Sequence, residues 1–170
     1  MLFQHQDSTS PEKSRPEKSS PEKTRYEVSR KDSTQPLSSY ALYPFELDGF
    51  EWPSVEHYYQ AMKFDDADYR DRIRQADTPK AAAKLGKRCW KKRRKNWKKN
   101  SITYMTRATY IKCRTHPEVA EMLLKSGELE IKDLSMYDYF WGTGRDQRGE
   151  NRFGKMLMGV RNKLQEEAAG

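Results

Sequence analysis

Apolar positions recur with helical spacing along most of the chain after residue 54. In the first such stretch, residues 54–63, they lie three or four positions apart, which is the spacing of one helix face. Ser54 is a favourable N-cap residue, and Glu56 puts a carboxylate into the first turn, where the helix dipole stabilises it. The pattern therefore predicts a helix after Ser54. Its expected buried stripe is Val55, Tyr58, Tyr59 and Met62.

Capping signals and apolar periodicity predict further helices. Thr78 followed by Pro79 is typical of a helix start, and Gly86 of a helix end. We expect Asn151 to cap the last helix. The apolar face of that helix is Phe153, Leu157, Val160 and Leu164. The predicted helices after the first are 68–76, 79–86, 94–113, 117–127 and one that starts after residue 151.

Strand signals are few. Residues 37–47 are aromatic and contain proline, which favours short extended pieces, and the Asp-Gly pair at 48–49 predicts a turn. Leu129 and Ile131 alternate with charged residues and predict a short strand, whereas 137–150 is typical of a loop. The chain lacks the strand–helix alternation of a doubly wound parallel sheet. We therefore predict an α+β fold that is mainly α-helical, with a few short strands.

The N-terminal residues differ from the rest of the chain. A Pro-Glu-Lys motif recurs every five residues, which prevents a helix, and residues 1–35 hold few apolar side chains to stabilise a fold. We expect 1–35 to be a disordered, low-complexity leader and 36–167 to be a single domain. A phosphorylated regulatory arm is the alternative, because Ser10 and Ser20 both precede proline. The repeats lie at 11–13, 16–18 and 21–23.

Composition narrows the class of protein. Charged residues make up 34% of the chain and hydrophobic ones 35%, and no apolar run approaches the roughly 18 residues of a membrane helix. Two cysteines, Cys89 and Cys113, exclude a disulfide framework and a zinc finger. We expect an intracellular, cytoplasmic protein, with the nucleus as an alternative in a eukaryote. The net charge of +8 favours anionic partners such as phosphates, nucleotides or nucleic acid.

Basic residues are most concentrated at 87–99, where nine of thirteen residues are Lys or Arg and none is acidic. Three interpretations stay open from the sequence. The run is a solvated charged face, a phosphate-binding patch that includes Trp90 and Trp97, or a nuclear import signal at 91–95.

Two carboxylates are the best candidates for chemistry. Glu56 lies among apolar helix residues, and Asp138 precedes an aromatic Phe-Trp pair. Two carboxylates that flank an anomeric carbon can split a glycosidic bond, although each could equally be a capping residue. Trp97 and Trp141 could stack on a flat ring or fill the core, and Lys63 could hold an anion or lie at the surface. We find no metal-ligand cluster or Ser/Cys nucleophile motif.

Five blocks of sequence resemble the NADAR superfamily, which includes the YbiA-like N-glycosidases. They occur in the family's order and cover residues 36–166. The blocks are DGFEWPSVEHYYQAMKF at 48–64, AAAKLGK at 81–87, RKNW at 94–97, DYFWGTG at 138–144 and NRFGKMLMGVR at 151–161.

The resemblance implies hydrolysis of an N-glycosidic bond at a phosphorylated ribose, without a metal or redox cofactor. It places the family's catalytic residues on Glu56, Trp97 and Asp138. The implied substrate is ADP-ribose attached to guanine, in nucleic acid or as a free nucleoside. Ribose-5-phosphate intermediates of riboflavin biosynthesis are the alternative, and a non-catalytic module that binds ADP-ribose or nucleic acid is a third possibility.

One block departs from the family pattern. Where many members have Ser-Asn-Phe, this chain has Ser38, Ser39 and Tyr40, so the asparagine amide is absent and contacts to substrate there are expected to differ. The expected substrate-binding residues are Ser38, Ser39, Lys63, Arg94, Trp141, Gly142, Asn151 and Lys155.

Overall fold

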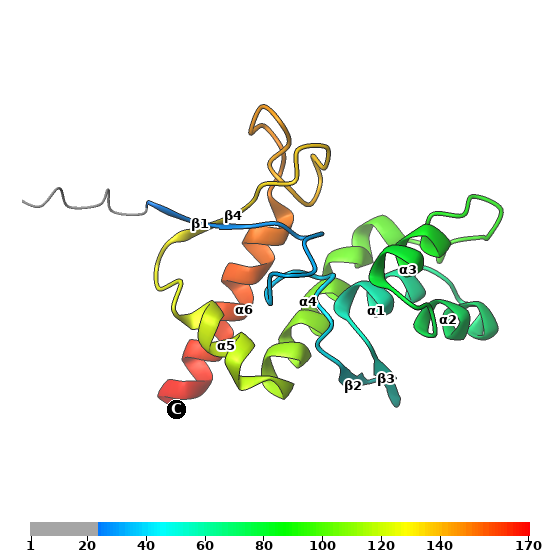
Figure 1. Cartoon of the computed structure of the whole chain (residues 1–170), viewed down its shortest axis with the longest axis horizontal. Coiled ribbons are helices and arrows are strands. Elements are labelled where there is room, and N and C mark those ends of the chain that lie inside the picture. Colours follow the sequence, from blue (N-terminus) through cyan, green and yellow to red (C-terminus); the bar gives the residue numbers. More distant parts are fainter. Residues whose placement is uncertain (1–23) are drawn as a thin grey trace, which may run out of the picture.

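The computed structural model describes residues 24–170 and confirms the mainly helical α+β class (Figure 1). The helices hold far more of the described residues than the strands, which are three or four residues long. In order, the elements are β1 (Arg25–Val28), β2 (Phe45–Leu47), β3 (Phe50–Trp52), α1 (Val55–Ala61), α2 (Ala67–Arg74), α3 (Pro79–Gly86), α4 (Trp97–Thr115), α5 (Pro117–Leu124), β4 (Glu130–Asp133) and α6 (Arg152–Ala169).

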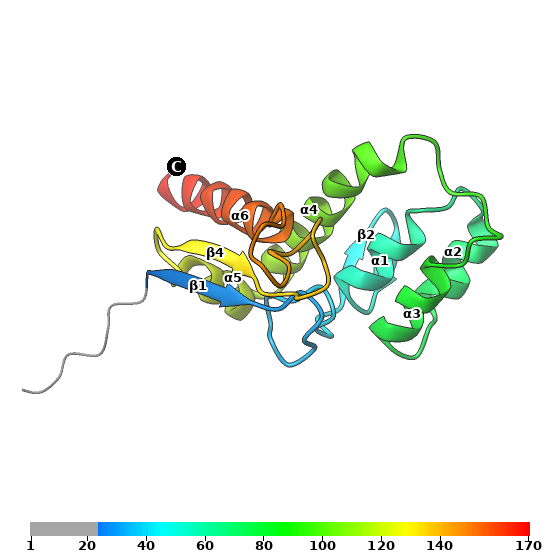
Figure 2. The same cartoon turned by 90° about the horizontal axis from the view of Figure 1, so that it is seen from above.

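The described residues form two halves that meet along α4 (Figures 1 and 2). One half holds β1, β4, α5 and α6, and the other holds α1, α2, α3 and the β2–β3 hairpin. Helix α4 packs against α1 on one side and against α6 on the other. Side chains from both halves share one core. In α6, the predicted apolar face is buried: Phe153, Leu157, Val160 and Leu164.

Each small sheet has a definite register. Strands β1 and β4 pair in parallel, with Arg25 opposite Glu130, and β2 and β3 pair antiparallel, with Phe45 opposite Trp52. The hairpin turns at 48–49, where both residues have positive φ, 56° and 78°. Two successive positive φ angles match the strand twist and favour Asp-Gly, so the predicted turn is confirmed.

Helix α1 begins as predicted but is buried on all sides. The Ser54 hydroxyl accepts a hydrogen bond from the His57 backbone N–H at 3.4 Å. The His57 ring also contacts Ser54 Oγ at 2.8 Å and the Ala76 carbonyl at 3.0 Å, so it supports the local packing. Burial lowers the pKa of His57. The predicted stripe is buried, but Glu56 and Gln60 are buried with it. Burial of a polar side chain costs free energy unless the side chain is hydrogen-bonded. Glu56 and Gln60 therefore require polar partners inside the protein.

The fold begins earlier than the sequence predicts. Residues 24–35 belong to the described structure, because β1 pairs with β4 and the chain then turns back into the core. The expected boundary at residue 36 is therefore corrected. The segment holds few apolar residues, and the partner strand is distant in sequence, so the local pattern did not predict β1. The Pro-Glu-Lys repeats, Ser10 and Ser20 lie outside the described residues.

Asn151 is a second correction. Its backbone is left-handed, with φ 50°, and its side chain caps no helix N–H. The Asn151 side chain instead accepts from the Asp133 backbone N–H at 2.9 Å and donates to the Ile131 carbonyl at 2.9 Å. These bonds attach the start of α6 to β4 and therefore fix both ends of the loop that joins them.

A buried lysine fixes the segment between β1 and β2. Lys112 on α4 donates from Nζ to the Pro36 carbonyl at 2.7 Å and to the Ser38 carbonyl at 2.8 Å. Burial lowers the pKa of Lys112 to about 8. The bonds place residues 36–39 beside the N-terminus of α1, where the Glu56 backbone N–H donates to the Ser39 carbonyl at 2.8 Å.

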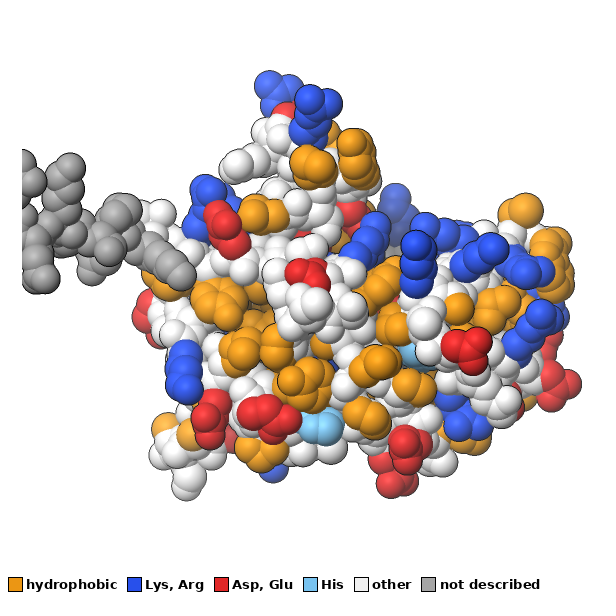
Figure 3. All heavy atoms as spheres, in the orientation of Figure 1, with side chains coloured by type: hydrophobic (Ala, Val, Ile, Leu, Met, Phe, Trp, Pro, Cys, Tyr) orange, Lys and Arg blue, Asp and Glu red, His pale blue; other side chains and the backbone are white. Residues whose placement is uncertain are grey.

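The basic run at 87–99 joins α3 to α4 and lies at the surface. Figure 3 shows Lys and Arg side chains gathered around α3 and the segment that follows it. Trp90 is 61% exposed, with the Arg88 guanidinium 5.7 Å and the Lys91 ammonium 5.3 Å from its ring centroid. Among the described residues 24–170, no helix is long and apolar enough to span a membrane.

Two glycines of α6 provide a matched test of the packing against β4. A Cβ on Gly154 would lie 2.1 Å from the Ile131 carbonyl, whereas a Cβ on Gly159 would meet nothing within 4 Å. We expect Gly154→Ala to lower the free energy of unfolding by about 1–3 kcal/mol because the helix must move off the strand. Gly159→Ala should raise it by about 0.5–1 kcal/mol because alanine favours the helix. Urea unfolding of both variants measures this, and equal shifts would contradict the close packing.

Candidate active site

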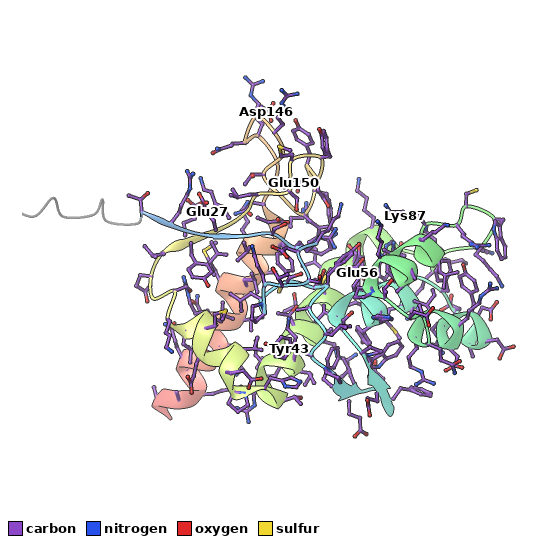
Figure 4. The ribbon with its side chains drawn as sticks, viewed as in Figure 1. Glu27, Tyr43, Glu56, Lys87, Asp146 and Glu150 are labelled. Carbon is purple, nitrogen blue, oxygen red and sulfur yellow. The ribbon has the colours of Figure 1, made fainter. Side chains whose placement is uncertain are left out.

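Glu56 is buried at the first turn of α1 and has three polar partners. Its Oε2 accepts from Arg30 Nη1 at 3.0 Å and from Ser39 Oγ at 2.9 Å, and its Oε1 accepts from Gln60 Nε2 at 2.6 Å. The side chain is only 1% exposed. Figure 4 labels Glu56 near the middle of the described molecule, where the two halves meet. The capping role that the sequence left open does not account for these contacts.

Asp138 lies in the loop between β4 and α6. Its Oδ1 accepts from the backbone N–H groups of Trp141 at 2.8 Å and Phe140 at 3.2 Å, which is a turn typical of aspartate. Its Oδ2 accepts from Arg30 Nη2 at 3.2 Å. Burial opposes ionisation of Asp138, but the Trp141 N–H and the Arg30 guanidinium outweigh it and hold its pKa below the usual value. Asp138 therefore stays ionised at neutral pH.

Arg30 joins the two carboxylates. It follows β1, is 5% exposed, and directs one guanidinium nitrogen to Glu56 and the other to Asp138. Burial alone would lower the pKa of Arg30, but the charges of Glu56 and Asp138 raise it. A buried carboxylate is costly without a cationic partner, so Arg30 makes this arrangement possible. The two carboxylates that the sequence singles out thus share one guanidinium.

Aromatic rings form a row beside the carboxylates. The Tyr59 ring lies at its centre, with centroids 5.2 Å from Trp97 and 5.6 Å from Trp141. Trp97 also stacks on Tyr104, with 5.6 Å between centroids and 18° between planes. The Arg30 guanidinium is 5.9 Å from the Trp141 ring, so the row reaches the carboxylate cluster. Trp97 is half-buried, and Trp141 belongs to the core.

Lys63 brings a cation to the same row. Its Nζ lies 5.3 Å from the Tyr59 ring centroid and 6.0 Å from that of Trp97. It donates to the Gly86 carbonyl at 3.4 Å, which leaves two of its three N–H groups for other acceptors. Burial lowers the pKa of Lys63 to about 8, against the opposing attraction of Glu56. A fraction of the Lys63 side chains is therefore an uncharged amine at mildly alkaline pH.

The remaining predicted substrate-binding residues are more dispersed. Ser39 contacts Glu56 directly, whereas Ser38 Oγ donates to the Arg30 carbonyl at 2.6 Å. Gly142 closes the Asp138 turn so tightly that a Cβ would lie 2.9 Å from the Asp138 carbonyl. Asn151 holds β4, as described above.

Arg94 and Lys155, two predicted substrate-binding cations, lie apart from the carboxylate cluster. Among the hydrogen bonds and ion pairs of the described residues, none joins either side chain to Glu56, Asp138 or Arg30. The Arg94 guanidinium lies 2.9 Å from Asp65 Oδ1 and donates to Tyr104 Oη at 2.5 Å. Its backbone N–H nevertheless donates to the Lys63 carbonyl at 2.6 Å, so Arg94 supports the Lys63 backbone. Lys155 is exposed in α6. Binding of substrate by Arg94 and Lys155 stays a prediction.

Sequence reasoning missed four residues of the cluster. Arg30 lay in the presumed leader, and Gln60 and Tyr59 were assigned to helix packing or passed over. Tyr40 was noted only as a departure from the family pattern. The short apolar alternation in Arg25–Val28 was the one signal that this segment is a strand. Among residues 24–170, no group of three or more His, Cys, Asp or Glu side chains could hold a metal ion.

Arg30→Gln tests whether the guanidinium controls the ionisation of Asp138. We expect the pKa of Asp138 to rise, because loss of the guanidinium leaves the effect of burial opposed only by the Trp141 N–H and the smaller effect of the Lys31 charge. The titration midpoint of the Asp138 carboxyl carbon, followed by NMR, measures this. Arg30→Lys should restore part of the shift, and Arg25→Gln, which breaks an exposed pair with Glu27, serves as the matched control. An unchanged midpoint in Arg30→Gln would refute the assignment.

Comparisons with known proteins agree with this architecture. The sequence model of the NADAR domain matches residues 15–165. The chain is 37% identical over 125 residues to N-glycosidase YbiA of Escherichia coli (strain K12), covering 74% of this chain and 78% of that protein. It is 38% identical over 117 residues to a riboflavin biosynthesis protein of Vibrio vulnificus, of which it covers 32%.

A solved structure shows the same fold. The NMR structure of the E. coli protein YbiA superposes with a TM-score of 0.77 at 33% sequence identity, covering 86% of this chain and 89% of that one. The match of the sequence model to most of the chain, the identity with YbiA and the shared fold have one explanation: this chain is a member of the NADAR domain family.

Proposed function

We propose that this NADAR-family hydrolase of N-glycosidic bonds removes ADP-ribose from guanine in nucleic acid or in a nucleoside. The observation that carries the proposal is the buried cluster in which Glu56 and Asp138 share the Arg30 guanidinium. Relatives at 37–40% identity named N-glycosidases support the bond type. The aromatic row and Lys63 support a planar, phosphorylated ligand.

The proposed reaction passes through an oxocarbenium-like transition state. As the bond from C1′ to the base nitrogen breaks, positive charge builds on the ribose, and an ionised carboxylate beside C1′ stabilises it. The bonding electrons leave with the base, which takes up a proton. A water oxygen bonds to C1′ and loses a proton to a carboxylate or to solvent. One of Glu56 and Asp138 stabilises the charge and the other activates the water. The variants Glu56→Gln and Asp138→Asn distinguish which residue has which role.

Arg30 contributes by orienting both carboxylates and by helping to hold the pKa of Asp138 below its usual value. The Arg30 guanidinium and two carboxylates together carry one net negative charge, which suits a cationic transition state. Trp97 and Trp141 would enclose the ribose or base and exclude bulk water. Lys63, beside Trp97, would hold a phosphate of the substrate.

Ribose-5-phosphate intermediates of riboflavin biosynthesis are the second candidate substrate. One observation favours them: Lys63 is the single buried ammonium beside the aromatic row among the described residues, and it suits a single phosphate. Relatives named riboflavin biosynthesis proteins, from V. vulnificus and Zea mays, point the same way. Both candidates require hydrolysis of an N-ribosidic bond, whereas a binding module would return its ligand intact.

Glu56→Gln tests the proposed activity. We expect turnover to fall by about 10²- to 10⁴-fold, because the variant keeps the shape of the side chain but cannot carry the charge or accept the proton. The assay incubates the protein with ADP-ribosylated guanine in single-stranded DNA and, separately, with a ribose-5-phosphate riboflavin intermediate. Mass spectrometry then follows release of the base and the sugar.

Glu51→Gln is the matched control, because Glu51 is an exposed glutamate of β3. Asp138→Asn under the same conditions separates the two carboxylates, since loss of the water-activating group alone should change the acid limb of the pH–rate profile. Full activity of Glu56→Gln would remove Glu56 from the mechanism. No cleavage by the wild-type protein would favour a binding module.

Lys63 predicts a pH dependence of substrate capture. Its pKa is lowered to about 8, so we expect kcat/KM for a phosphorylated substrate to fall as pH rises through about 8, when the free enzyme loses this ammonium. Lys63→Arg keeps the charge at all these pH values and should abolish the decline. Steady-state kinetics from pH 6.5 to pH 9.5 measure it, and the same decline in both proteins would assign it to another group.

A further inference from the structure

We propose that residues 88–99, together with the exposed rings of the loop after β4, bind the unmodified nucleotides of a single-stranded nucleic acid on either side of the reacting one. We call this surface, residues 88–99 with Tyr137, Tyr139 and Phe140, the basic surface. The proposal rests on the proposed N-glycosidase function, because it identifies the partner that carries the guanine to the carboxylate cluster. It selects one of the three interpretations of the basic run that the sequence leaves open.

The exposed cations of the basic surface lack acidic partners. Lys91 and Arg94 are paired, with Asp66 at 2.7 Å and with Asp65 at 2.9 Å. The exposed cations, in contrast, form no ion pair within residues 24–170. They are Lys92, Arg93, Lys95, Lys98 and Lys99. Like charges so close together repel one another, and a polyanion that runs along them relieves that repulsion.

Trp90 gives the basic surface an exposed ring. It is 61% exposed, although tryptophan is highly buried on average. A T-shaped contact with the Tyr69 ring, with 5.9 Å between centroids, holds it in place, and Arg88 and Lys91 lie beside it. A base can stack on this ring while its phosphate meets a cation. Neither a solvated charged face nor a nuclear import signal requires an exposed tryptophan, so the ring favours nucleic acid.

Two adjoining hollows run along the basic surface. The first, of about 490 Å³, lies between residues 64–66 and residues 91–95, and its two carboxylates are those already paired with Arg94 and Lys91. The second, of about 420 Å³, lies between residues 96–99 and the side chains of Phe140 and Arg152. The hollows adjoin because residue 95 lines the first and residue 96 the second. Such a path suits a flexible single strand better than a stiff duplex.

The path leads past the carboxylate cluster. Trp97 of the aromatic row lies in the chain between two residues that line the second hollow. Burial is the main cause of the lowered pKa of Lys63, and the nearby charge of Arg93 lowers it further. In the second hollow, the Phe140 backbone N–H donates to Asp138 Oδ1 at 3.2 Å. A strand that occupies both hollows therefore brings one nucleotide to the aromatic row and leaves its neighbours on the cations.

Two tyrosines extend the basic surface on the other side of the cluster. Tyr137 is 84% exposed and Tyr139 is 48% exposed, and they are the chain neighbours of Asp138. Figure 3 shows hydrophobic and basic side chains on the projecting loop at the top of the view, and further basic side chains around α3. Aromatic rings stack on bases of any sequence. We therefore expect stacking to hold the strand on both sides of the reacting nucleotide.

Binding of an unmodified strand tests the basic surface independently of turnover. Fluorescence anisotropy of the full chain with a labelled single-stranded DNA of about 15 nucleotides should detect binding at low salt. Lys92→Gln/Lys95→Gln/Lys99→Gln removes cations from both hollows and should weaken binding by at least about tenfold. The slope of log Kd against log salt should also become shallower by about two, because each phosphate contact to a single strand contributes about 0.7.

A second triple variant controls for net charge. Arg114→Gln/Lys125→Gln/Lys163→Gln removes the same charge from exposed positions near the C-terminal ends of α4, α5 and α6, away from α3 (Figure 1), and should leave binding unchanged. Trp90→Ala should weaken binding by at least about fivefold, whereas Trp90→Phe keeps a ring and should retain most of it. Absence of binding to the wild-type protein, an equal effect of both triple variants, or binding to phosphatidylserine–phosphatidylcholine vesicles in place of the strand would overturn the proposal.

Turnover distinguishes a failure of the basic surface from a failure of the proposed reaction. Lys92→Gln/Lys95→Gln/Lys99→Gln should lower kcat/KM for ADP-ribosylated guanine in single-stranded DNA by at least about tenfold, mainly through KM. It should leave kcat/KM for the ADP-ribosylated nucleoside unchanged, because that substrate has no flanking phosphates. Equal losses on both substrates would overturn the basic surface. Strand binding that the variant loses, without cleavage of either substrate by the wild-type protein, would retain the surface and refute the proposed function.

Discussion

One buried guanidinium supports the arrangement of the rest of this structure. Arg30 contacts Glu56 at 3.0 Å and Asp138 at 3.2 Å, and through them it joins the end of β1, the start of α1 and the loop after β4. Without it, two carboxylates would lie close together under the surface, where each loses the hydration that normally stabilises its charge. Other buried polar groups hold the same three segments: Lys112 fixes the chain that leads to Ser39, and Asn151 fixes the end of β4.

The proposed function places opposite electrostatic demands on the site. A cationic transition state needs unneutralised negative charge, whereas a phosphorylated ligand needs positive charge. The structure separates the two: the carboxylates surround Arg30, while Lys63 lies beside the Tyr59 and Trp97 rings. Burial acts differently on each group, since it lowers the pKa of Lys63 to about 8 but is outweighed at Asp138.

The sequence predicts what local signals determine. The Ser54 and Thr78 caps, the Asp-Gly turn at 48–49 and the apolar face of α6 all follow from neighbouring residues, and the structure confirms them. Glu56 and Asp138 could be singled out by residue type, but no local pattern showed that they approach each other. Their meeting depends on Arg30, which is 108 residues from Asp138, and on the pairing of β1 with β4, whose partners are also far apart in sequence. The periodicity of apolar residues does not report contacts between distant segments. For that reason the sequence places β1 in a leader and predicts a capping role for the Asn151 side chain.

The parallel pairing of β1 with β4 also has a consequence for the order in which the protein matures. A ribosome releases β1 and α1 long before it has made β4 and the Asp138 loop, so Arg30 and Glu56 have left the ribosome before Asp138 exists. Contacts between such distant segments form late, because a long loop must close first. The complete charge cluster therefore forms only after most of the polypeptide has been translated, and a nascent chain that ends before Asp138 cannot form it.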